Sequence, residues 1–310
     1  MNLRQLLVVI DPAQEPQPAL ERAVWLARHG GAALELLACE FEQNLDGSLL
    51  FDERQHEQAR SALLAHRQAR LEELAAPLRA EGLQVRTEVR WGRPLHRTIL
   101  GRIEELKPDL VFKAATRNHG LLRRLLLGNT CWQLLRHCPV PLWLAHHGQW
   151  QGRRLCAALD PLHDADKPAQ LDQRLIATAR ELGERLRMDA HYLHCHAPLP
   201  RSLVFDAELV ATYDAYVERG NRQHRQAFER LLAPYAIPAS HRHLEQGYPE
   251  EVIPRFVRDR QIDLLLMGAI ARGHLDNALI GNTAERVLEA LECDLLILKP
   301  QPWESSAARQ

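Results

Sequence analysis

The 310-residue chain has few aromatic residues, no long apolar run and no strong excess of charge of either sign. Its net charge is −1, and neither half has the basic excess typical of a nucleic-acid-binding domain. No apolar run approaches the roughly 20 residues of a membrane-spanning helix. The chain starts directly with a short apolar run, without the basic and then apolar pattern of a signal peptide. We therefore expect a cytoplasmic protein with no nucleic-acid and no membrane partner.

Cysteine is also scarce, and its spacing excludes two common uses. The six cysteines are Cys39, Cys131, Cys138, Cys156, Cys195 and Cys293, and none of them forms a Cys-x-x-Cys pair. This usage is typical of reduced, mostly buried thiols in a cytoplasm, and it argues against a disulfide framework.

Three motifs of well-known enzyme classes are missing as well. The chain has no Gly-x-Ser-x-Gly elbow, no Gly-x4-Gly-Lys-Ser/Thr loop and no Gly-x-Gly-x-x-Gly fingerprint. No candidate nucleophile or general base has a clear partner. We predict no catalytic residue and, at most, slow ATP hydrolysis.

The most informative feature that is present is an internal repeat. The triplet Gly128-Asn129-Thr130 recurs as Gly281-Asn282-Thr283, 153 residues later, and each copy follows an apolar run and opens an amphipathic segment. Asp109 and Asp263 also match, because each precedes an apolar strand-like run. Self-similarity at this period indicates a duplicated domain, and the length suits two domains. We predict domains at residues 1–148 and 149–302, followed by a frayed tail at 303–310.

Each half alternates short apolar runs with longer helical patterns, which indicates an α/β fold with a parallel sheet covered by helices on both faces. The strands expected in the first half are residues 6–10, 34–40, 84–90, 110–114 and 140–145. Those expected in the second half are residues 155–159, 190–196, 240–244, 264–267 and 295–298. A long helix is expected after the second strand of each half, at residues 52–80 and 204–234.

In an open parallel sheet, ligands bind beyond the carboxyl ends of the strands, where the strand order reverses. In the second half, the residues expected there are Asp160, Gly268, Arg272, Gly273, Gly281, Asn282 and Thr283. The glycines allow the backbone to approach a ligand closely, and Arg272 supplies a positive charge. Asn282 and Thr283 can hydrogen-bond a phosphate at a helix N-terminus. Alternatively, the triplet forms only a tight turn and a helix cap.

These residues resemble the nucleotide-binding members of the universal stress protein family, which carry Gly-x2-Gly-x9-Gly-Ser/Thr after the fourth strand. This chain has Gly268-x2-Ala271-x9-Gly281-Asn282. The family also has an aspartate that ends the first strand, matched by Asp11 and Asp160. It often has a histidine and an aliphatic residue at the end of the second strand, where His194-Cys195 and Ala38-Cys39 stand. The resemblance covers nearly the whole chain, as two tandem copies.

The resemblance implies ATP or a related adenine nucleotide, with Cys195 beside the adenine. The chain departs from the family pattern at Ala271 and Asn282, and the loop of the first half has no glycine corresponding to Gly268. We therefore expect one nucleotide per chain, in the second domain. The degenerate equivalent in the first domain consists of Asp11, Cys39, Gly128, Asn129 and Thr130.

The resemblance further implies two doubly wound, flavodoxin-like domains with strand order 3-2-1-4-5. Family members commonly pair through the last strand of the sheet, which implies an intramolecular pseudo-dimer; a homodimer is an alternative. The implied function is a stress response through regulation rather than fast catalysis. The alternatives are a binding module for a different small molecule or a metal, and a protein-interaction platform.

Histidines form a second candidate site in the second half. Period-two alternation puts His194 and His196 on one face of their strand, and His241 and His243 on one face of the next. Such a cluster could bind zinc. The alternative is a partly exposed polar edge of the sheet, with His194 as the residue typical of the family.

Overall fold

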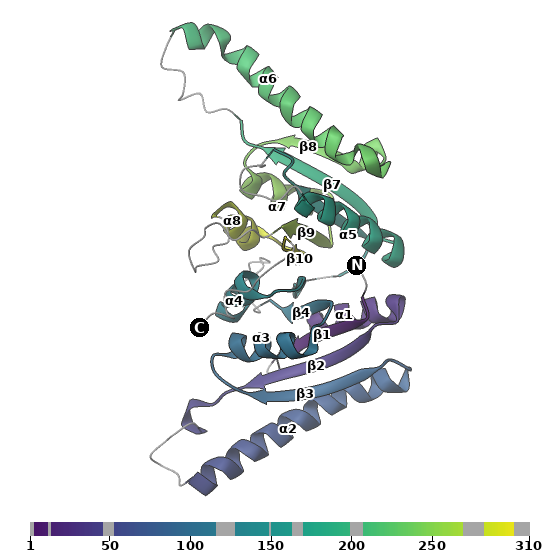
Figure 1. Cartoon of the computed structure of the whole chain (residues 1–310), viewed down its shortest axis with the longest axis vertical. Helices are drawn as coiled ribbons and strands as arrows, with labels where there is room; N and C mark the ends of the chain where they lie inside the picture. Colours follow the sequence, from purple (N-terminus) through teal and green to yellow (C-terminus); the bar gives the residue numbers. More distant parts are fainter. Residues whose placement is uncertain are drawn as a thin grey trace. The chain divides into compact units, whose positions relative to one another are not determined.

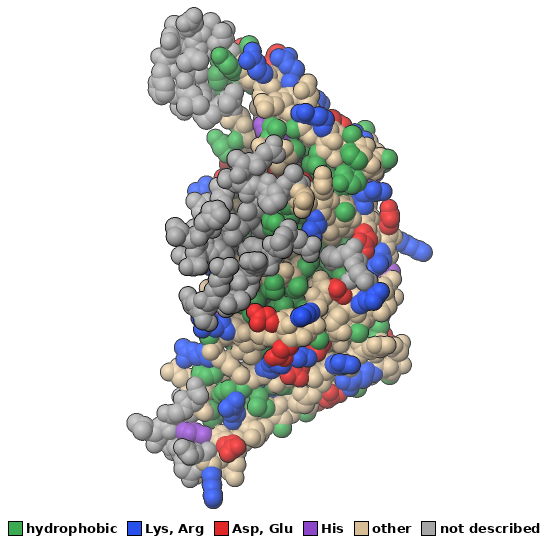
Figure 2. Space-filling model, viewed as in Figure 1, with side chains coloured by type: hydrophobic (Ala, Val, Ile, Leu, Met, Phe, Trp, Pro, Cys, Tyr) green, Lys and Arg blue, Asp and Glu red, His purple; other side chains and the backbone are tan. Residues whose placement is uncertain are grey.

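The computed structural model describes residues 3–11, 14–45, 53–115, 128–148, 150–162, 170–198, 207–268 and 282–300. These residues fall into two compact units, one ending at residue 148 and the other beginning at residue 150 (Figure 1). On the surface in view, lysine and arginine side chains are interspersed with aspartate and glutamate rather than gathered into one large patch (Figure 2). Among the helices of the described residues, none is both long and apolar enough to cross a membrane.

The first unit is a five-stranded parallel sheet. Its strands are β1 (Gln5–Ile10), β2 (Ala33–Glu40), β3 (Val85–Trp91), β4 (Leu110–Ala114) and β5 (Leu142–Ala145). Their order is β3-β2-β1-β4-β5, which confirms the expected order 3-2-1-4-5. The helices are α1 (Pro18–Gly30), α2 (Glu53–Ala80), α3 (Leu95–Leu106) and α4 (Asn129–His137), with a 3₁₀ turn η1 (Gln43–Leu45).

The second unit repeats this plan. Its strands are β6 (Arg154–Leu159), β7 (Asp189–His196), β8 (Arg242–Gln246), β9 (Leu264–Gly268) and β10 (Asp294–Leu298), all parallel in the order β8-β7-β6-β9-β10. The helices are α5 (Gln170–Leu186), α6 (Ala207–Leu232), α7 (Pro249–Asp259) and α8 (Asn282–Ala290). Two 3₁₀ turns, η3 (Ala233–Tyr235) and η4 (Ala239–His241), lie between α6 and β8.

Apolar strands and amphipathic helices account for this arrangement. The central strands β1 and β6 are almost entirely buried, because helices cover both faces of a parallel sheet. In the first unit α1 packs against β1 and β4, and α2 packs along β2 and β3. In the second unit α5 packs against β6, β7 and β9.

One predicted strand begins later than expected. Residues 239–241 form η4, and the N–H of His241 donates to the carbonyl oxygen of Pro238 at 3.0 Å. The strand β8 therefore begins at Arg242 instead of Ser240. His241 lies in this turn and not in the strand, so it cannot follow the strand alternation assumed for it.

The matched aspartates Asp109 and Asp263 hold equivalent positions. One carboxylate oxygen of Asp109, Oδ2, accepts hydrogen bonds from the N–H groups of Arg4 at 2.7 Å and Gln5 at 2.9 Å. Oδ2 of Asp263 accepts from Arg153 at 2.8 Å and Arg154 at 2.9 Å. Each aspartate, which directly precedes β4 or β9, therefore links that strand by hydrogen bonds to the start of the central strand, β1 or β6.

Candidate functional site

The strand order of the second unit reverses at β6. This strand pairs with β7 on one side and with β9 on the other, so the chain leaves β6 and β9 toward opposite faces. Asp160 directly follows β6, and Gly268 is the last residue of β9. The structure thus brings these two predicted site residues to the crevice where a ligand of an open parallel sheet binds.

Asp160 is half-buried and lies close to Cys195 at the end of β7. Burial, with a further contribution from the Asp160 carboxylate, raises the pKa of the Cys195 thiol to about 12. The thiol is therefore protonated near neutral pH and is a poor nucleophile, because the reactive form of cysteine is the thiolate. This chemistry suits a residue that contacts a ligand rather than one that attacks it.

Two features of the structure explain why a glycine, with no side chain, stands at position 268. A Cβ at this position would lie 2.6 Å from Cδ2 of Leu171, a fully buried residue of α5. The glycine consequently makes room for α5 on the sheet. Its backbone also lies at the crevice, so packing and ligand approach both favour glycine here.

The other predicted contacts of the second domain are only partly located. Arg272, Gly273 and Gly281 lie outside the described residues, and Asn282 and Thr283 open α8 with side chains that are not described. The expected helix start at the second triplet is therefore present. Which of these side chains reach the crevice stays a prediction.

In the first unit, the equivalent aspartate, Asp11, forms hydrogen bonds with residues that follow it closely in the sequence. Oδ2 of Asp11 accepts a hydrogen bond from Nε2 of Gln14 at 2.7 Å, and Nε2 of Gln17 donates to the Asp11 carbonyl at 2.7 Å. Cys39 is the penultimate residue of β2, and burial raises the pKa of its thiol to about 12.

The first triplet begins a helix. Gly128 is the N-cap of α4, and its carbonyl accepts from the N–H of Trp132 at 3.1 Å. Asn129 and Thr130 follow it in the first turn of α4.

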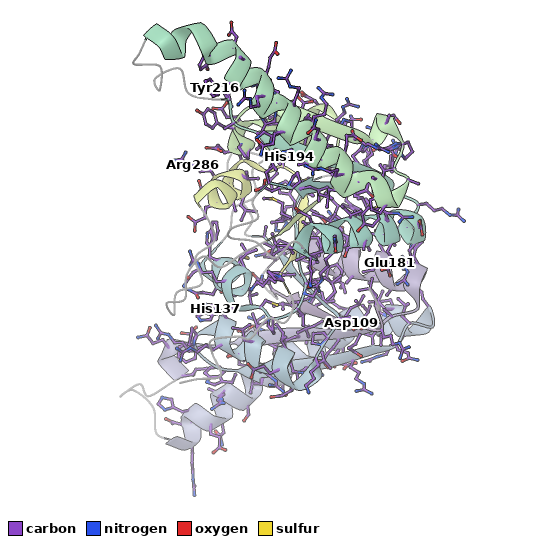
Figure 3. All side chains as sticks on the ribbon, turned by 45° about the horizontal axis from the view of Figure 1, so that its top comes forward. Asp109, His137, Glu181, His194, Tyr216 and Arg286 are labelled. Carbon is purple, nitrogen blue, oxygen red and sulfur yellow. The ribbon has the colours of Figure 1, made fainter. Side chains whose placement is uncertain are left out.

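A group of three histidines, His194, His196 and His224, lies between β7 and α6. Figure 3 labels His194 next to α6. The Asp160 carboxylate acts electrostatically on His224. Nδ1 of His194 lies 3.0 Å from the carbonyl oxygen of Leu159, so this nitrogen carries a proton, and in the neutral ring Nε2 is an acceptor. Nδ1 of His224 then donates to Nε2 of His194 at 2.9 Å. The ring of His196 stacks on that of His224, with 4.2 Å between centroids and 9° between planes.

A second group, consisting of His191, His241 and His243, lies on the opposite face of the same sheet, against α7. Nδ1 of His191 is 3.0 Å from Nε2 of His243, and Nε2 of His191 is 3.2 Å from Oδ2 of Asp189. His241 also contacts Asp189, with 2.6 Å between Nε2 and Oδ1. Burial lowers the pKa of His243 to about 4, and the pKa of His191 is also lowered, chiefly by burial.

The four histidines predicted to bind zinc therefore do not lie together in one site, and the prediction of a zinc site is wrong. His194 and His196 face α6, whereas His241 and His243 lie with His191 on the α7 side. Alternation along β7 and the pairing of Leu193 with His243 produce this separation. In the part of the chain that the structure describes, no group of three or more His, Cys, Asp or Glu side chains is arranged to hold a metal ion.

His224 is the member of the first histidine group that sequence analysis missed. It lies one helical turn before Phe228, whose side chain is 1% exposed, and both rings pack on His194. A polar residue four positions from a core aromatic residue shares the buried face of its helix. That spacing is the signal that could have indicated a role for His224.

Comparison with known proteins agrees with the two-domain architecture. The sequence pattern of the universal stress protein family matches residues 2–146 and again residues 164–299. The chain is 28% identical over 311 residues to universal stress protein E of Escherichia coli K12, covering 97% of this chain and 96% of the relative. It is 30% identical over 314 residues to a universal stress protein E homolog of Haemophilus influenzae, covering 97% and 98%.

Solved structures give the same result for the fold. A functionally unknown protein from Pseudomonas aeruginosa PAO1 superposes with a TM-score of 0.73 at 29% identity, covering 96% of this chain and 93% of that one. A universal stress protein from Archaeoglobus fulgidus shares the fold, with a TM-score of 0.66 at 17% identity and coverage of 95% and 98%. Because the family pattern matches both halves of the sequence, the chain belongs to the universal stress protein family.

Proposed function

We propose that this protein acts in a stress response and binds one adenine nucleotide, ATP or a close relative, in its second domain. The observation that carries the proposal is the convergence of Asp160, Cys195 and Gly268 at the carboxyl ends of β6, β7 and β9, where the strand order reverses. In this proposal the Asp160 carboxylate accepts from the ribose hydroxyls, and the backbone of Cys195 contacts the adenine.

The phosphates are proposed to lie toward α8. Gly268 admits the backbone to the ligand, and Asn282 and Thr283 stand at the helix start, where N–H groups and the helix dipole favour an anion. Arg272, Gly273 and Gly281 belong to the segment that joins β9 to α8. We expect this segment to complete the phosphate site.

The first domain is proposed to leave its equivalent site empty. Asp11 already accepts from Gln14, and the first-domain loop lacks a glycine where the second domain has Gly268. A side chain at that position would hold a phosphate away from the backbone N–H groups. One nucleotide per chain is the expected stoichiometry.

Regulation rather than fast turnover fits the described chemistry of the site. The pKa of the Cys195 thiol is raised to about 12, and the pKa of His224 is lowered, first by burial and then by His194. Neither group forms an activated nucleophile with a base. A cytoplasmic location and an intramolecular pseudo-dimer remain predictions.

Calorimetric titration with ATP tests the proposal. We expect saturable binding at one site per chain for the wild type, loss of binding in Gly281→Trp, and unchanged binding in the matched first-domain variant Gly128→Trp. Absence of ATP binding by the wild type would refute the proposal, and two sites per chain would refute the assignment to one domain. Mass spectrometry of the molecules released on denaturation would identify a ligand of a different class.

A further inference from the structure

The peptide group that joins Leu159 to Asp160 leads from the strand β6 into the proposed nucleotide crevice. Its carbonyl oxygen accepts a hydrogen bond from Nδ1 of His194 at 3.0 Å. Its N–H donates to Oδ1 of Asp172, in the first turn of α5, at 3.4 Å. Side chains therefore bind both polar groups of this one peptide, and Asp160 is the residue that the peptide carries into the crevice.

Both of these side chains are buried. His194 is 1% exposed and Asp172 is 4% exposed. The ring of His194 packs on the rings of Phe228 and His224 of α6, with 5.8 Å and 5.1 Å between centroids. A buried polar atom is costly to leave without its partner, so each side chain has a strong reason to keep its bond to the peptide.

His224 determines which nitrogen of His194 carries the hydrogen. Nδ1 of His224 donates to Nε2 of His194 at 2.9 Å, and a neutral imidazole ring has a hydrogen on only one of its two nitrogens. The hydrogen of His194 is therefore kept on Nδ1, where it faces the carbonyl oxygen of Leu159. Through this hydrogen bond the helix α6 contributes to the position of the peptide.

The first domain lacks this support at the matched position. Leu159 and His194 are partners in the register of β6 and β7. The corresponding partners in β1 and β2 are Ile10 and Ala38, and the alanine side chain has no donor for the carbonyl oxygen of Ile10. The histidine support is therefore specific to the domain to which we assign the nucleotide.

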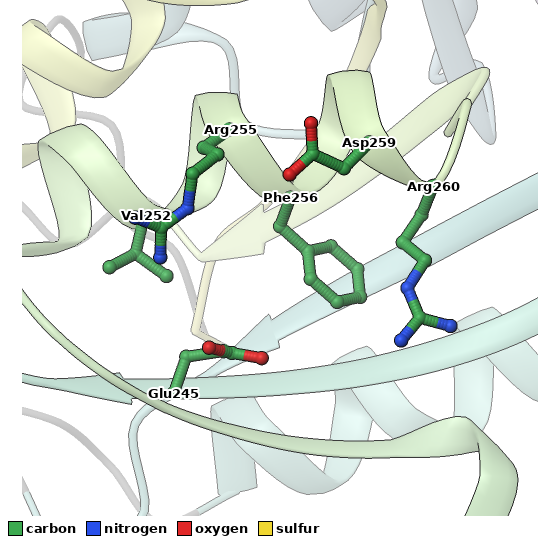
Figure 4. Close-up of a pocket in the computed structure, with 6 residues that line it drawn as sticks. All are labelled: Glu245, Val252, Arg255, Phe256, Asp259 and Arg260. Atoms are coloured by element: carbon green, nitrogen blue, oxygen red, sulfur yellow. The ribbon is translucent and has the colours of Figure 1, made fainter.

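The opposite face of the sheet borders the crevice in a different way. A pocket of about 180 Å³ lies there between β8 and α7 (Figure 4). Its lining consists of Glu245, Val252, Arg255, Phe256, Asp259 and Arg260. Glu245 pairs in register with Cys195, so this pocket adjoins the crevice from the α7 side. None of the lining residues belongs to β6 or α5, whereas His194 binds the Leu159 carbonyl from the α6 side.

We propose that His194 is a positioning residue of the nucleotide site in the second domain. Together with Asp172 it holds the peptide before Asp160, so that the Asp160 carboxylate is directed at the ribose before the ligand arrives. A group that is already in place loses less conformational freedom on binding, which raises the affinity. The inference rests on the proposed nucleotide function and extends it to a residue that need not touch the ligand.

Two substitutions at position 194 separate the hydrogen bond from the volume of the ring. In His194→Asn the side-chain amide can still donate to the Leu159 carbonyl, whereas His194→Leu fills the space without a donor. We expect calorimetric titration to show about tenfold weaker ATP binding for His194→Leu and nearly wild-type binding for His194→Asn. Equal weakening in both variants, or weakening in neither, would overturn the proposal.

His191→Asn is the matched control for these titrations. It removes a second buried histidine from the same strand, but this histidine packs against His243 on the α7 side and pairs in register with Cys156. ATP affinity should be unchanged in this control. Weakening as large as that of His194→Leu would show that loss of any histidine of β7 disturbs the crevice, and the specific role of His194 would be wrong.

Hydrogen exchange without ATP gives a readout that does not depend on the ligand. The Asp160 amide belongs to the held peptide, so its exchange should be about tenfold faster in His194→Leu and close to wild type in His194→Asn. Nitrogen NMR of the wild type should find the hydrogen of His194 on Nδ1. A wild type that does not bind ATP would refute the proposed function and, with it, this role. ATP binding with unchanged Asp160 exchange in His194→Leu would overturn the positioning role alone.

Discussion

Nε2 of His194 lies 2.9 Å from Nδ1 of His224, so one hydrogen bond between two imidazole rings joins the buried strand β7 to the helix α6. Nδ1 of His194 is committed as a donor to the Leu159 carbonyl. The pair therefore holds together with both rings neutral, or with one additional proton between them. A second proton leaves two N–H groups facing each other and breaks the bond.

The stability of the second domain is expected to fall on acidification. Burial is the main cause that lowers the pKa of His196, His224 and His191 below 6.5, and it lowers that of His243 to about 4. The unfolded chain therefore binds protons more readily than the folded one. The contribution of these neutral histidines to the free energy of unfolding is complete above about pH 6.5. It is lost as the pH falls toward the pKa values that the histidines have in the folded domain.

Urea unfolding between about pH 7 and pH 5, with hydrogen exchange read on β7 and β8, measures this effect. Replacing His224 by leucine should make the pH dependence shallower, because the helix then carries no group with a lowered pKa against β7. His66→Gln, on the exposed surface of α2, is the control and should leave the dependence unchanged. A domain that gains stability on acidification would contradict the prediction.

Sequence patterns located the elements of the fold well, because apolar runs of parallel strands are short and clearly bounded. The strand 110–114 was predicted with the bounds of β4, whereas the start of β8 was missed because residues 239–241 form a 3₁₀ turn. The repeat of Gly-Asn-Thr correctly indicated two helix starts.

The histidine site could be predicted only in part. Alternation correctly placed His194 and His196 on one face of β7. It could not say whether His243 shares that face, because this depends on the register between β7 and β8. His224 was missed because it belongs to a helix whose contact with the sheet depends on tertiary packing.

The buried ion pair of the first domain gives a second prediction. The Glu35 side chain is 1% exposed and accepts from Nε and Nη2 of Arg102, both at 2.7 Å. Arg102→Gln leaves a buried carboxylate without its cation, which costs about 3–5 kcal/mol for a fully buried pair. The lower end is expected, because the Arg102 side chain is 19% exposed.

Urea denaturation of the Arg102→Gln variant provides the measurement. Arg28→Gln is a suitable control, since the pair of Arg28 with Glu81 is about half exposed on both sides and should contribute about 0–1 kcal/mol. Equal losses in the two variants would show that burial of Glu35 has no special cost.

The aspartates at the starts of the strands give a third prediction. Asp109→Ala removes an acceptor of two N–H groups and Asp263→Ala an acceptor of three, so we expect a loss of about 1–3 kcal/mol in the corresponding domain. Because both residues lie at the amino ends of the strands, the affinity for ATP should not change while the domains remain folded. Unfolding curves and ATP titration of the same samples check both parts, and a change in ATP affinity in a folded variant would contradict this placement.

The last prediction separates the two reasons for a glycine at position 268. A Cβ there meets Cδ2 of Leu171 at 2.6 Å, so Gly268→Ala overpacks the contact with α5 and should cost about 1–3 kcal/mol. Adding Leu171→Ala removes the colliding side chain, so the double variant should lose less stability than the sum of the two single variants. If the glycine also admits a phosphate to the backbone, ATP binding stays weak in the double variant even though the clash is relieved. If the double variant recovers its ATP affinity when the clash is relieved, Gly268 serves packing alone. The single variant Leu171→Ala is the control, because it measures the loss of stability caused by the cavity that this substitution creates.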